Sequence, residues 1–250
     1  MAVPAFRAAG TLLESIGTLT VNAAPAGLAT DDIEFLVCES MDEAVSLTTT
    51  GGFVEVTGSP VSAPHATDAL LRTRLTVYWR RWATGLADPI TNDPGNHIGA
   101  YRVAFSGCIA TGNPWDTTIA SSETVDDGTG SATGGTTSVG ECLIAVFIAH
   151  AKPDLAGGTA EMSAHTNADL TSVTERYDDA FASGNGGWLG LITGEKATAG
   201  AFTATTYTKA VVSYKAHLVV ALKPPEVASA VIPDILKAPR VPVGWDSGRL

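Results

Sequence analysis

One short run of residues limits the possible folds of this chain more than any other. From Cys142 to Ala149 every residue is apolar, and β-branched and aromatic side chains are frequent. The run is too short for a free-standing helix, and the Gly/Thr/Ser-rich residues 128–140 before it are typical of the approach to a strand. A strand with one face in water would alternate polar and apolar residues. We therefore expect both faces of this strand to be covered, either within the subunit or, on one face, by a neighbouring copy.

The rest of the sequence indicates many short strands joined by turns. The segment 183–187, Ser-Gly-Asn-Gly-Gly, is typical of a tight turn that joins two strands in a hairpin. No long amphipathic helix and no internal repeat is found. This pattern predicts an all-β fold, a jelly-roll-like antiparallel β-sandwich in one domain over residues 1–224. Strands are expected over residues 5–22, 33–38, 51–57, 72–82, 98–109, 142–149, 169–177, 188–194, 203–208 and 216–223.

Two glycine patterns resemble nucleotide-binding loops. Gly128-x-Gly-x-x-x-Gly134 and Gly184-x-Gly-x-x-x-Gly190 are one residue longer than the dinucleotide fingerprint and lack its strand–loop–helix context. We interpret both as turns. The sequence contains no P-loop, nucleophile elbow or paired-cysteine motif, and we expect no cofactor.

Charge excludes several classes of partner. Only 16% of the residues are charged, 45% are hydrophobic, and the formal net charge is −11. Binding to nucleic acid or to an anionic membrane needs a positive surface, so we expect neither partner. The N-terminal residues lack the apolar core of a signal peptide and no run reaches the length of a membrane span, which favours a protein made in a reducing cytoplasm.

The cysteines and the other metal-ligand residues suggest structural roles. Cys38, Cys108 and Cys142 each lie in or beside an apolar segment, which predicts buried thiols, with an intermolecular disulfide as the alternative. No two of the five histidines have a metal-ligand spacing, and no metal site is expected. The acidic pairs at 31–32, 126–127 and 178–179 are interpreted as turn residues.

One cluster combines basic and aromatic side chains, over residues 78–82, Tyr-Trp-Arg-Arg-Trp. Stacking on bases or on sugars is one interpretation. The other is a strand in which Trp79 belongs to the core and Arg80 pairs with a carboxylate. The acidic net charge favours the second interpretation over nucleic-acid binding, while sugar binding stays open.

The last residues, 225–250, differ from the rest. Proline recurs among apolar residues, so this segment cannot build a core of its own. We expect an extended C-terminal arm that packs on a neighbouring subunit, or alternatively across its own sandwich. The residues expected to contact the partner are Ile232, Ile235, Leu236, Val243 and Trp245.

Several segments resemble a loosely defined group of structural proteins of tailed bacteriophages. They are Pro25 to Ile33 before an apolar strand, Arg74 to Arg81, residues 112–116 (Gly-Asn-Pro-Trp-Asp), residues 183–187, and the terminal His217 to Pro224. The resemblance covers residues 4–224 and consists of turn and strand signatures. It implies a β-sandwich module on a virion and brings no catalytic residues.

These observations lead to one main hypothesis and two alternatives. The main one is a non-enzymatic virion protein that decorates or cements the head or forms part of the tail, as a homo-oligomer in contact with major capsid or tail proteins. The first alternative is a receptor-binding module that recognises carbohydrate through two loops, with contacts expected at Asn113, Trp115, Asn185 and Trp188. The second is a hydrolase domain, which would need a cleft with two titrating carboxylates.

Overall fold

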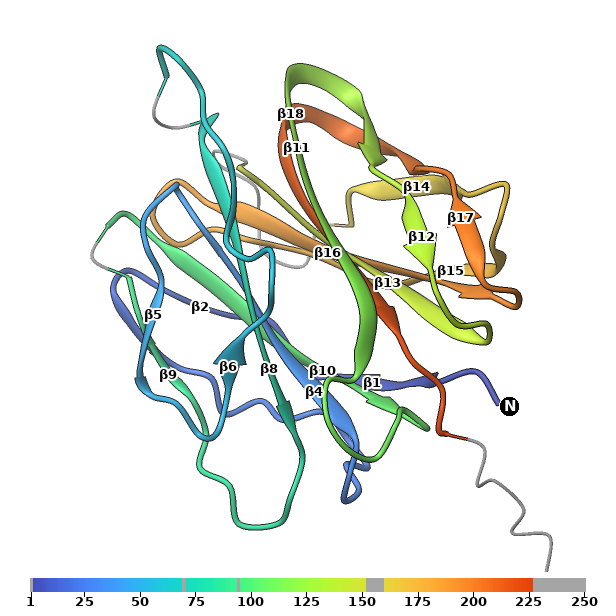
Figure 1. The fold of residues 1–250 in the computed structure, drawn as a ribbon. Coiled ribbons are helices and arrows are strands. Elements are labelled where there is room, and N and C mark those ends of the chain that lie inside the picture. Colours follow the sequence, from blue (N-terminus) through green and yellow to red (C-terminus); the bar gives the residue numbers. More distant parts are fainter. Residues whose placement is uncertain (1, 69–70, 94, 152–159, 227–250) are drawn as a thin grey trace, which may run out of the picture.

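Two antiparallel sheets lie face to face in the computed structural model, which describes residues 2–68, 71–93, 95–151 and 160–226 (Figure 1). The first sheet has the order β1 (Ala5–Ala9), β10 (Ile98–Ser106), β4 (Ile33–Ser40), β8 (Thr73–Arg81) and β6 (Val54–Glu55), with β2 (Leu13–Ser15) paired to β10 and β7 (Val61–Ala63) paired to β8. The second has the order β11 (Trp115–Ala132), β18 (Thr205–Leu222), β13 (Cys142–Ala151), β16 (Gly187–Lys196) and β15 (Thr171–Phe181), with β14 (Met162–Thr166) paired to β18. The all-β sandwich prediction is confirmed.

The main core fills the space between the two sheets. Alternate residues of β4, β8 and β10 face alternate residues of β13, β16 and β18, as the two-residue period of a strand requires. At its centre the rings of Phe35 and Phe147 lie 5.0 Å apart, and Phe105 meets Phe35 edge-on at 5.8 Å. Trp79 packs against this core from β8.

The apolar strand β13 is covered on both faces inside the subunit, and all ten of its residues are buried. Leu143 and Phe147 face the first sheet, whereas Ile144 and Ile148 belong to a second core on the outer side of the second sheet. Of the two explanations that the sequence left open, the structure shows the one that needs no neighbour. The missing alternation in this strand is therefore no argument for an oligomer.

Two outer layers supply the extra cover (Figure 1). A small sheet with the order β3 (Thr18–Thr20), β9 (Ile90–Asn92) and β5 (Ser46–Thr49) packs on the outer face of the first sheet, around Leu36 and Cys38. On the opposite side, β14 and the pair β12 (Gly135–Thr137) and β17 (Gly200–Phe202) cover the second sheet.

The strands β11 and β18 form one long ribbon that bends over the edge of the second sheet (Figure 1). Their pairing runs from Trp115 opposite Leu222 to Ala132 opposite Thr205, with irregularities on either side of Asp127. Bulges of this kind bend a strand pair. The turn interpretation is wrong for residues 126–130, which lie inside β11, for the pair 178–179, which lies inside β15, and for Gly190, which lies inside β16. It is confirmed at residues 183–186, which lie between β15 and β16, whereas Gly187 is the first residue of β16.

The order of the strands separates the two halves of the chain. All strands of the first sheet lie between residues 5 and 106, and all strands of the second between 115 and 222. Two interleaved Greek keys, as in a jelly roll, would mix the halves. The jelly-roll element of the fold prediction is thus not found in the described strands. All of these strands fall within the domain predicted over 1–224.

Candidate functional site

Of the four residues predicted for loop contacts, the two tryptophans are buried. The Trp115 ring meets Trp79 edge-on at 5.0 Å, and Trp115 is a member of the main core. Trp188 is fully buried, donates its indole N–H to Asp178 at 2.6 Å and stacks on a histidine ring. Neither ring offers a face to a ligand in solution, so sugar stacking on these two residues has no support.

The two asparagines of the same prediction lie nearer the surface. Asn113 is exposed, and its side-chain oxygen accepts the backbone N–H of Trp115 at 3.2 Å, as in an Asx turn. Asn185 is half-buried and donates its backbone N–H to Asn96 at 2.7 Å. The first residue shapes its own loop, and the second joins the two sheets.

The basic-aromatic cluster at residues 78–82 has the structural role that the acidic net charge of the chain favoured. Trp79 packs on the main core, and the Arg80 guanidinium donates to the Glu34 carboxylate at 2.7 Å. Glu34 also accepts from Arg102 at 2.6 Å, and all three side chains are buried. Arg102 reaches Asp88 at 2.7 Å and the carbonyl of Val21 at 3.2 Å. These charges fasten the first sheet to the loops that cross it.

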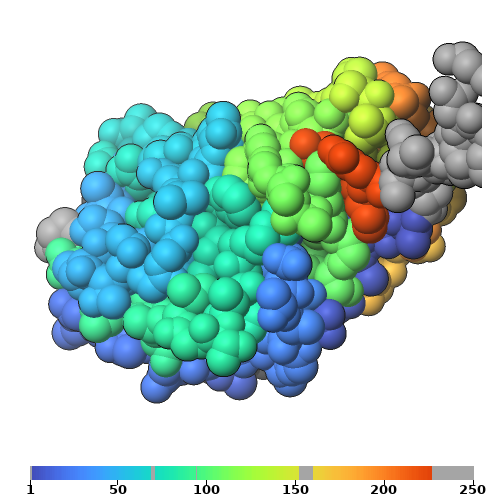
Figure 2. All heavy atoms as spheres, turned by 60° about the horizontal axis from the view of Figure 1, so that its bottom comes forward, coloured from blue at the N-terminus to red at the C-terminus, as the bar shows by residue number. Residues whose placement is uncertain are grey.

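The arm residues Ile232, Ile235, Leu236, Val243 and Trp245 lie outside the described residues. The structure does show how the chain leaves the sandwich, at residues 223–226, which we call the arm root. The backbone N–H of Lys223 donates to the Pro114 carbonyl at 2.8 Å, and its carbonyl accepts from Ile109 at 3.1 Å. Figure 2 shows the arm root (red) on the surface beside residues from the middle of the chain (green). Two backbone hydrogen bonds therefore hold Lys223 against residues 109 and 114.

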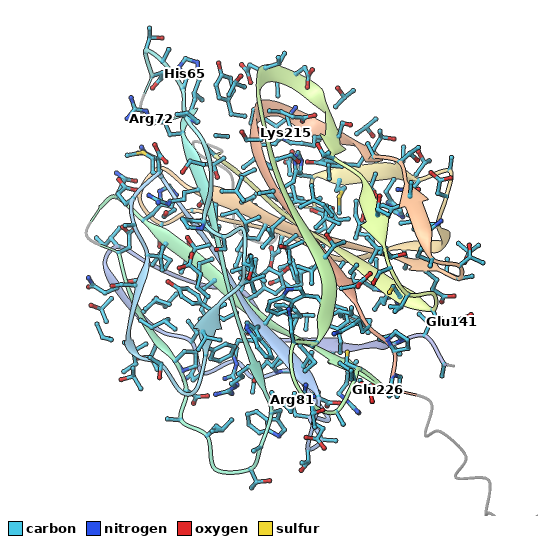
Figure 3. The ribbon with its side chains drawn as sticks, viewed as in Figure 1. His65, Arg72, Arg81, Glu141, Lys215 and Glu226 are labelled. Carbon is cyan, nitrogen blue, oxygen red and sulfur yellow. The ribbon has the colours of Figure 1, made fainter. Side chains whose placement is uncertain are left out.

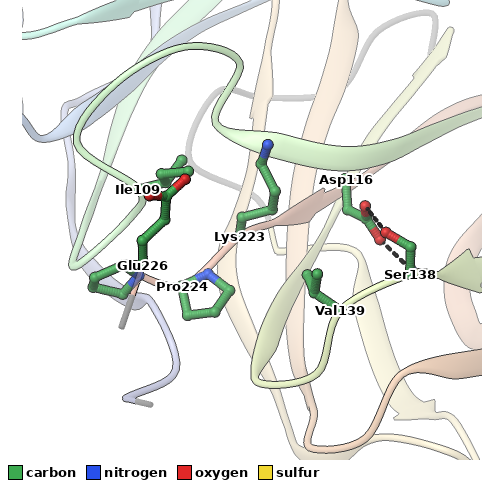
Figure 4. A pocket seen from close by; sticks show the side chains of 8 residues that line it. Ile109, Asp116, Ser138, Val139, Lys223, Pro224 and Glu226 are labelled. Carbon is green, nitrogen blue, oxygen red and sulfur yellow. Dashed lines mark hydrogen bonds between the residues drawn. The ribbon is translucent and has the colours of Figure 1, made fainter. Parts of the chain in front are cut away.

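A hollow of about 300 Å³ adjoins the arm root (Figure 4). Its apolar walls come from Ile109 and Val139 and from two prolines of the arm root. On its polar side the Asp116 carboxylate accepts the Ser138 hydroxyl at 2.6 Å and also the Ser138 backbone N–H. The hollow thus combines an apolar wall with the Asp116 carboxylate, which is already engaged in the fold, and with the charged residues Lys223 and Glu226.

A second group of ionisable side chains lies beneath the bend of the β11–β18 ribbon, and we call it the corner. Its members are Tyr207, Lys209, Lys215, His217 and Asp127 (Figure 3 labels Lys215). The Lys215 ammonium binds the Asp127 carboxylate at 2.6 Å and the carbonyl of Thr129. Burial, together with the charge of Lys215, lowers the pKa of Lys209 to about 7 and that of His217 to about 3. The Nε2 of neutral His217 is hydrogen-bonded to the Tyr207 hydroxyl at 2.8 Å.

A third group lies where the first sheet meets the β15–β16 turn, and we call it the socket: Glu39, Glu43, Asp93, Asn96 and His97. Glu39 and His97 are fully buried and 2.9 Å apart. Burial raises the pKa of Glu39, of Glu43 and of Asp93. Burial opposes protonation of His97, yet the three carboxylates raise its pKa on balance.

None of these arrangements is a recognisable reaction centre in the described part of the chain. No group of three or more metal-ligand side chains with metal-binding geometry is found among the described residues. The carboxylates with raised pKa line none of the three described hollows, whose volumes are about 210 to 300 Å³. Two carboxylates, those of Asp116 and Glu226, line the hollow at the arm root.

The three cysteines are buried free thiols, as predicted. Burial raises the pKa of all three, to about 12 for Cys108 and about 11 for Cys142. Such thiols react slowly, because the thiolate is the reactive form. An intermolecular disulfide would require the chain to open around them.

The corner and the socket were missed in the sequence because their members are far apart along the chain. Their signal was a charged residue inside an otherwise apolar strand, such as Glu39 at the end of β4 or Lys215 and His217 before the final apolar run of β18. Such a charge must be paired or neutralised when the strand is buried.

The fold and its buried polar groups define an all-β protein with two antiparallel sheets and covering outer layers. The described residues contain no helix of the length and hydrophobicity that crossing a bilayer requires. No protein-family model, no curated protein and no solved structure matches this chain.

Proposed function

We propose that this chain is a non-enzymatic structural protein of a tailed-phage particle, which decorates or cements the head or forms part of the tail. Its partners would be further copies of the chain and major capsid or tail proteins, and its location the virion. The observation that carries the proposal is the arm root. The final strand leaves the sandwich beside an open, partly apolar hollow, and the remaining sequence is apolar and rich in proline.

The arrangement of charges supports an assembly role. The ion pairs of the corner, of the socket and around Glu34 tie layers of the fold together. The contacts with partner proteins would then come from the outer surface and from the arm, as is common in assemblies. In this proposal the side chains of Ile232, Leu236 and Trp245 pack against a neighbouring subunit.

The test is the molar mass in solution, by light scattering, of three proteins. They are the full chain, a chain that ends at Pro225, and a full-length chain with Ile232, Ile235 and Leu236 changed to serine. We expect an oligomer for the first and monomers of the truncated and serine variants, because both lose the apolar contacts. The serine variant keeps the length, so it separates the role of these side chains from that of the chain end.

Two outcomes would contradict this assignment of the arm. Equal oligomers in all three proteins would place the interface on the sandwich. Monomers in all three, together with binding of the full chain on a glycan array, would favour the carbohydrate-binding alternative.

A further inference from the structure

The β15–β16 turn, residues 182–186, is the point at which the second sheet docks on loops of the first. Its Asn185 backbone N–H donates to the Asn96 side-chain oxygen at 2.7 Å, and the Asn185 amide contacts the sulfur of Met41 at 3.0 Å. The Glu14 carboxylate accepts two further N–H groups of the turn, from Ala182 and Ser183, at 2.7 and 2.6 Å. Both strand ends beside the turn are buried.

The contacts of His97 fix its protonation state. Its Nδ1 lies 3.0 Å from the Asn96 side-chain oxygen, and its Nε2 lies 2.9 Å from a Glu39 carboxylate oxygen. The Asn96 oxygen is identified as an acceptor because a backbone N–H, which can only donate, points at it from Asn185. Two acceptors therefore face the two ring nitrogens. The arrangement is satisfied when one proton lies on Nδ1 and another lies between Nε2 and Glu39.

Close packing leaves the pair little freedom to rearrange. A Cβ added at Gly187 would lie 2.4 Å from the Glu39 carboxylate, and one at Gly184 would lie 2.9 Å from the Cβ of His97. The ring of Phe181, the last residue of β15, meets the His97 ring at 5.4 Å. If the shared proton leaves, the Nε2 lone pair faces a carboxylate oxygen with no room for either group to turn away.

The surroundings of the socket are acidic. Glu43 and Asp93 each have a buried carboxylate oxygen without a hydrogen-bond partner among the described residues. The charged groups that act on His97 are Glu39 from β4, Glu43 from the loop after β4 and Asp93 from the loop after β9. Nearby, Glu14 of β2 binds the β15–β16 turn, and Arg74 of β8 donates to the Asp42 carbonyl at 3.4 Å. Carboxylates predominate, so the socket favours a bound proton.

We propose that His97 and Glu39 form a proton-operated latch, which holds the β15–β16 turn on the first sheet when the shared proton is bound and releases it when the proton leaves. The chain of contacts runs from Glu39 through His97 and Asn96 to the backbone of Asn185. Protonation thus acts on the seam between the two sheets at one end of the sandwich. The latch is independent of the proposed role in a virion.

The sign of the pH dependence follows from the raised pKa of His97. A group that holds its proton more tightly in the docked state stabilises docking at low pH, and the stabilisation is lost as the pH rises through the pKa of the docked state. The turn should therefore be docked in mildly acidic solution and open more often in alkaline solution. One released proton lowers the docking equilibrium by about tenfold for each pH unit between the pKa of the undocked state and that of the docked state, and the equilibrium is constant above the latter.

The experiment is an NMR titration of the full-length protein from about pH 5 to pH 9, the range in which histidines with a raised pKa lose their proton. It follows the ring nitrogens of His97 and the hydrogen-exchange protection of the Asn185 amide, corrected for the intrinsic pH dependence of exchange. The amide of Val146 in β13 reports global opening. We expect the protection at Asn185 to fall as the pH rises toward the His97 midpoint and to level off above it, while that at Val146 does not follow His97.

Three variants sharpen the test. Asn96→Asp places a charged acceptor against both donors and should move the His97 midpoint to higher pH. Glu43→Gln removes a carboxylate that favours the proton and should move it lower. Glu55→Gln changes an exposed carboxylate on β6 and should leave it unchanged. In each protein the pH at which the Asn185 protection levels off should follow the His97 midpoint.

Three results would overturn the latch. One is protection at Asn185 that stays constant while His97 titrates. Another is a His97 midpoint that is equal in all four proteins. The third is a His97 midpoint below that of an unperturbed histidine. If a variant fails to fold, the wild-type titration of His97, Asn185 and Val146 still shows whether the proton controls docking of the turn.

Discussion

At the scale of single residues, the charges inside the first sheet are the most demanding feature of the fold. Glu34 lies on a central strand, fully buried, and a single carboxylate serves two guanidinium groups. The desolvation of such charges is offset only while the ion pairs are complete. Arg80 additionally donates to the carbonyls of Gly51 and Ala87 at 2.6 and 3.0 Å, so the same group also holds a loop.

Glu34→Gln should therefore destabilise the protein far more than a surface change of the same kind. It keeps the volume of the side chain but removes the charge that both guanidinium groups require, and we expect a loss of about 3–5 kcal/mol in the free energy of unfolding. Urea denaturation measures this loss. Glu55→Gln on the exposed strand β6 is the matched control, with a change within about 0.5 kcal/mol. Equal stability of the two variants would show that the buried ion pairs are not required.

At the scale of elements, β13 and the bent ribbon determine the layering. β13 pairs with β16 on one side and with β18 on the other over almost its full length, and it contributes alternate side chains to two cores. The ribbon supplies one of these cores, because its second half turns back over the outer face of the second sheet. An unbroken apolar strand is thus explained by cover from its own chain.

This explanation predicts the effect of shortening a side chain on the outer face of β13. Ile144→Ala should cost about 2–5 kcal/mol, because it leaves a cavity in a packed core. Val125→Ala, on the exposed part of the ribbon, should change stability by no more than about 0.5 kcal/mol. Both values are to be measured over a wide range of protein concentrations. A loss that appears only at concentrations where the chain self-associates would mean that a neighbouring copy provides the cover.

At the scale of the whole molecule, local patterns in the sequence predicted the layers better than the contacts between distant residues. Alternation and turn signals each depend on a few adjacent residues, and such local signals were enough to indicate a sandwich. The bent ribbon was missed because Gly128 and Gly130 have the composition of a turn, whereas pairing with β18 keeps them in a strand. The ion pairs of Glu34 join residues 46 and 68 positions apart, and no local pattern indicates which arginines they involve.

The candidate site was less predictable than the fold for the same reason. His97 is followed by an apolar strand and gives no sign of its partner, Glu39, which lies 58 residues earlier. Trp115 and Trp188 stand beside turn signals, which favours exposure, but their rings are drawn into the two cores. A large aromatic residue next to a turn is thus a poor predictor of a binding surface in a fold with this many layers.

The socket and the corner should give the stability of the whole molecule opposite responses to acid. His217 is neutral in the folded protein, with a pKa of about 3 against an ordinary 6.5, so the unfolded chain binds a proton that the folded chain refuses. Stability contributed by His217 is complete above pH 6.5 and is lost as the pH falls toward about 3. The raised pKa of Glu43 acts in the opposite sense and adds stability as this carboxyl group becomes protonated. Lys209, with a pKa of about 7, is protonated in both states over this range.

We therefore expect His217→Gln to make the loss of stability on acidification shallower, by at most about 1.4 kcal/mol per pH unit, the value for one proton. Gln can still accept the Tyr207 hydroxyl, so the hydrogen bond at the corner is retained. Glu43→Gln should make the loss steeper. Because Glu43 lies in the loop after β4 and His217 lies on β18 of the second sheet, the double variant should show the sum of the two changes within about 0.5 kcal/mol. Urea denaturation of the four proteins at a series of pH values measures these slopes. A double variant far from additivity would mean that the corner and the socket communicate through the sandwich.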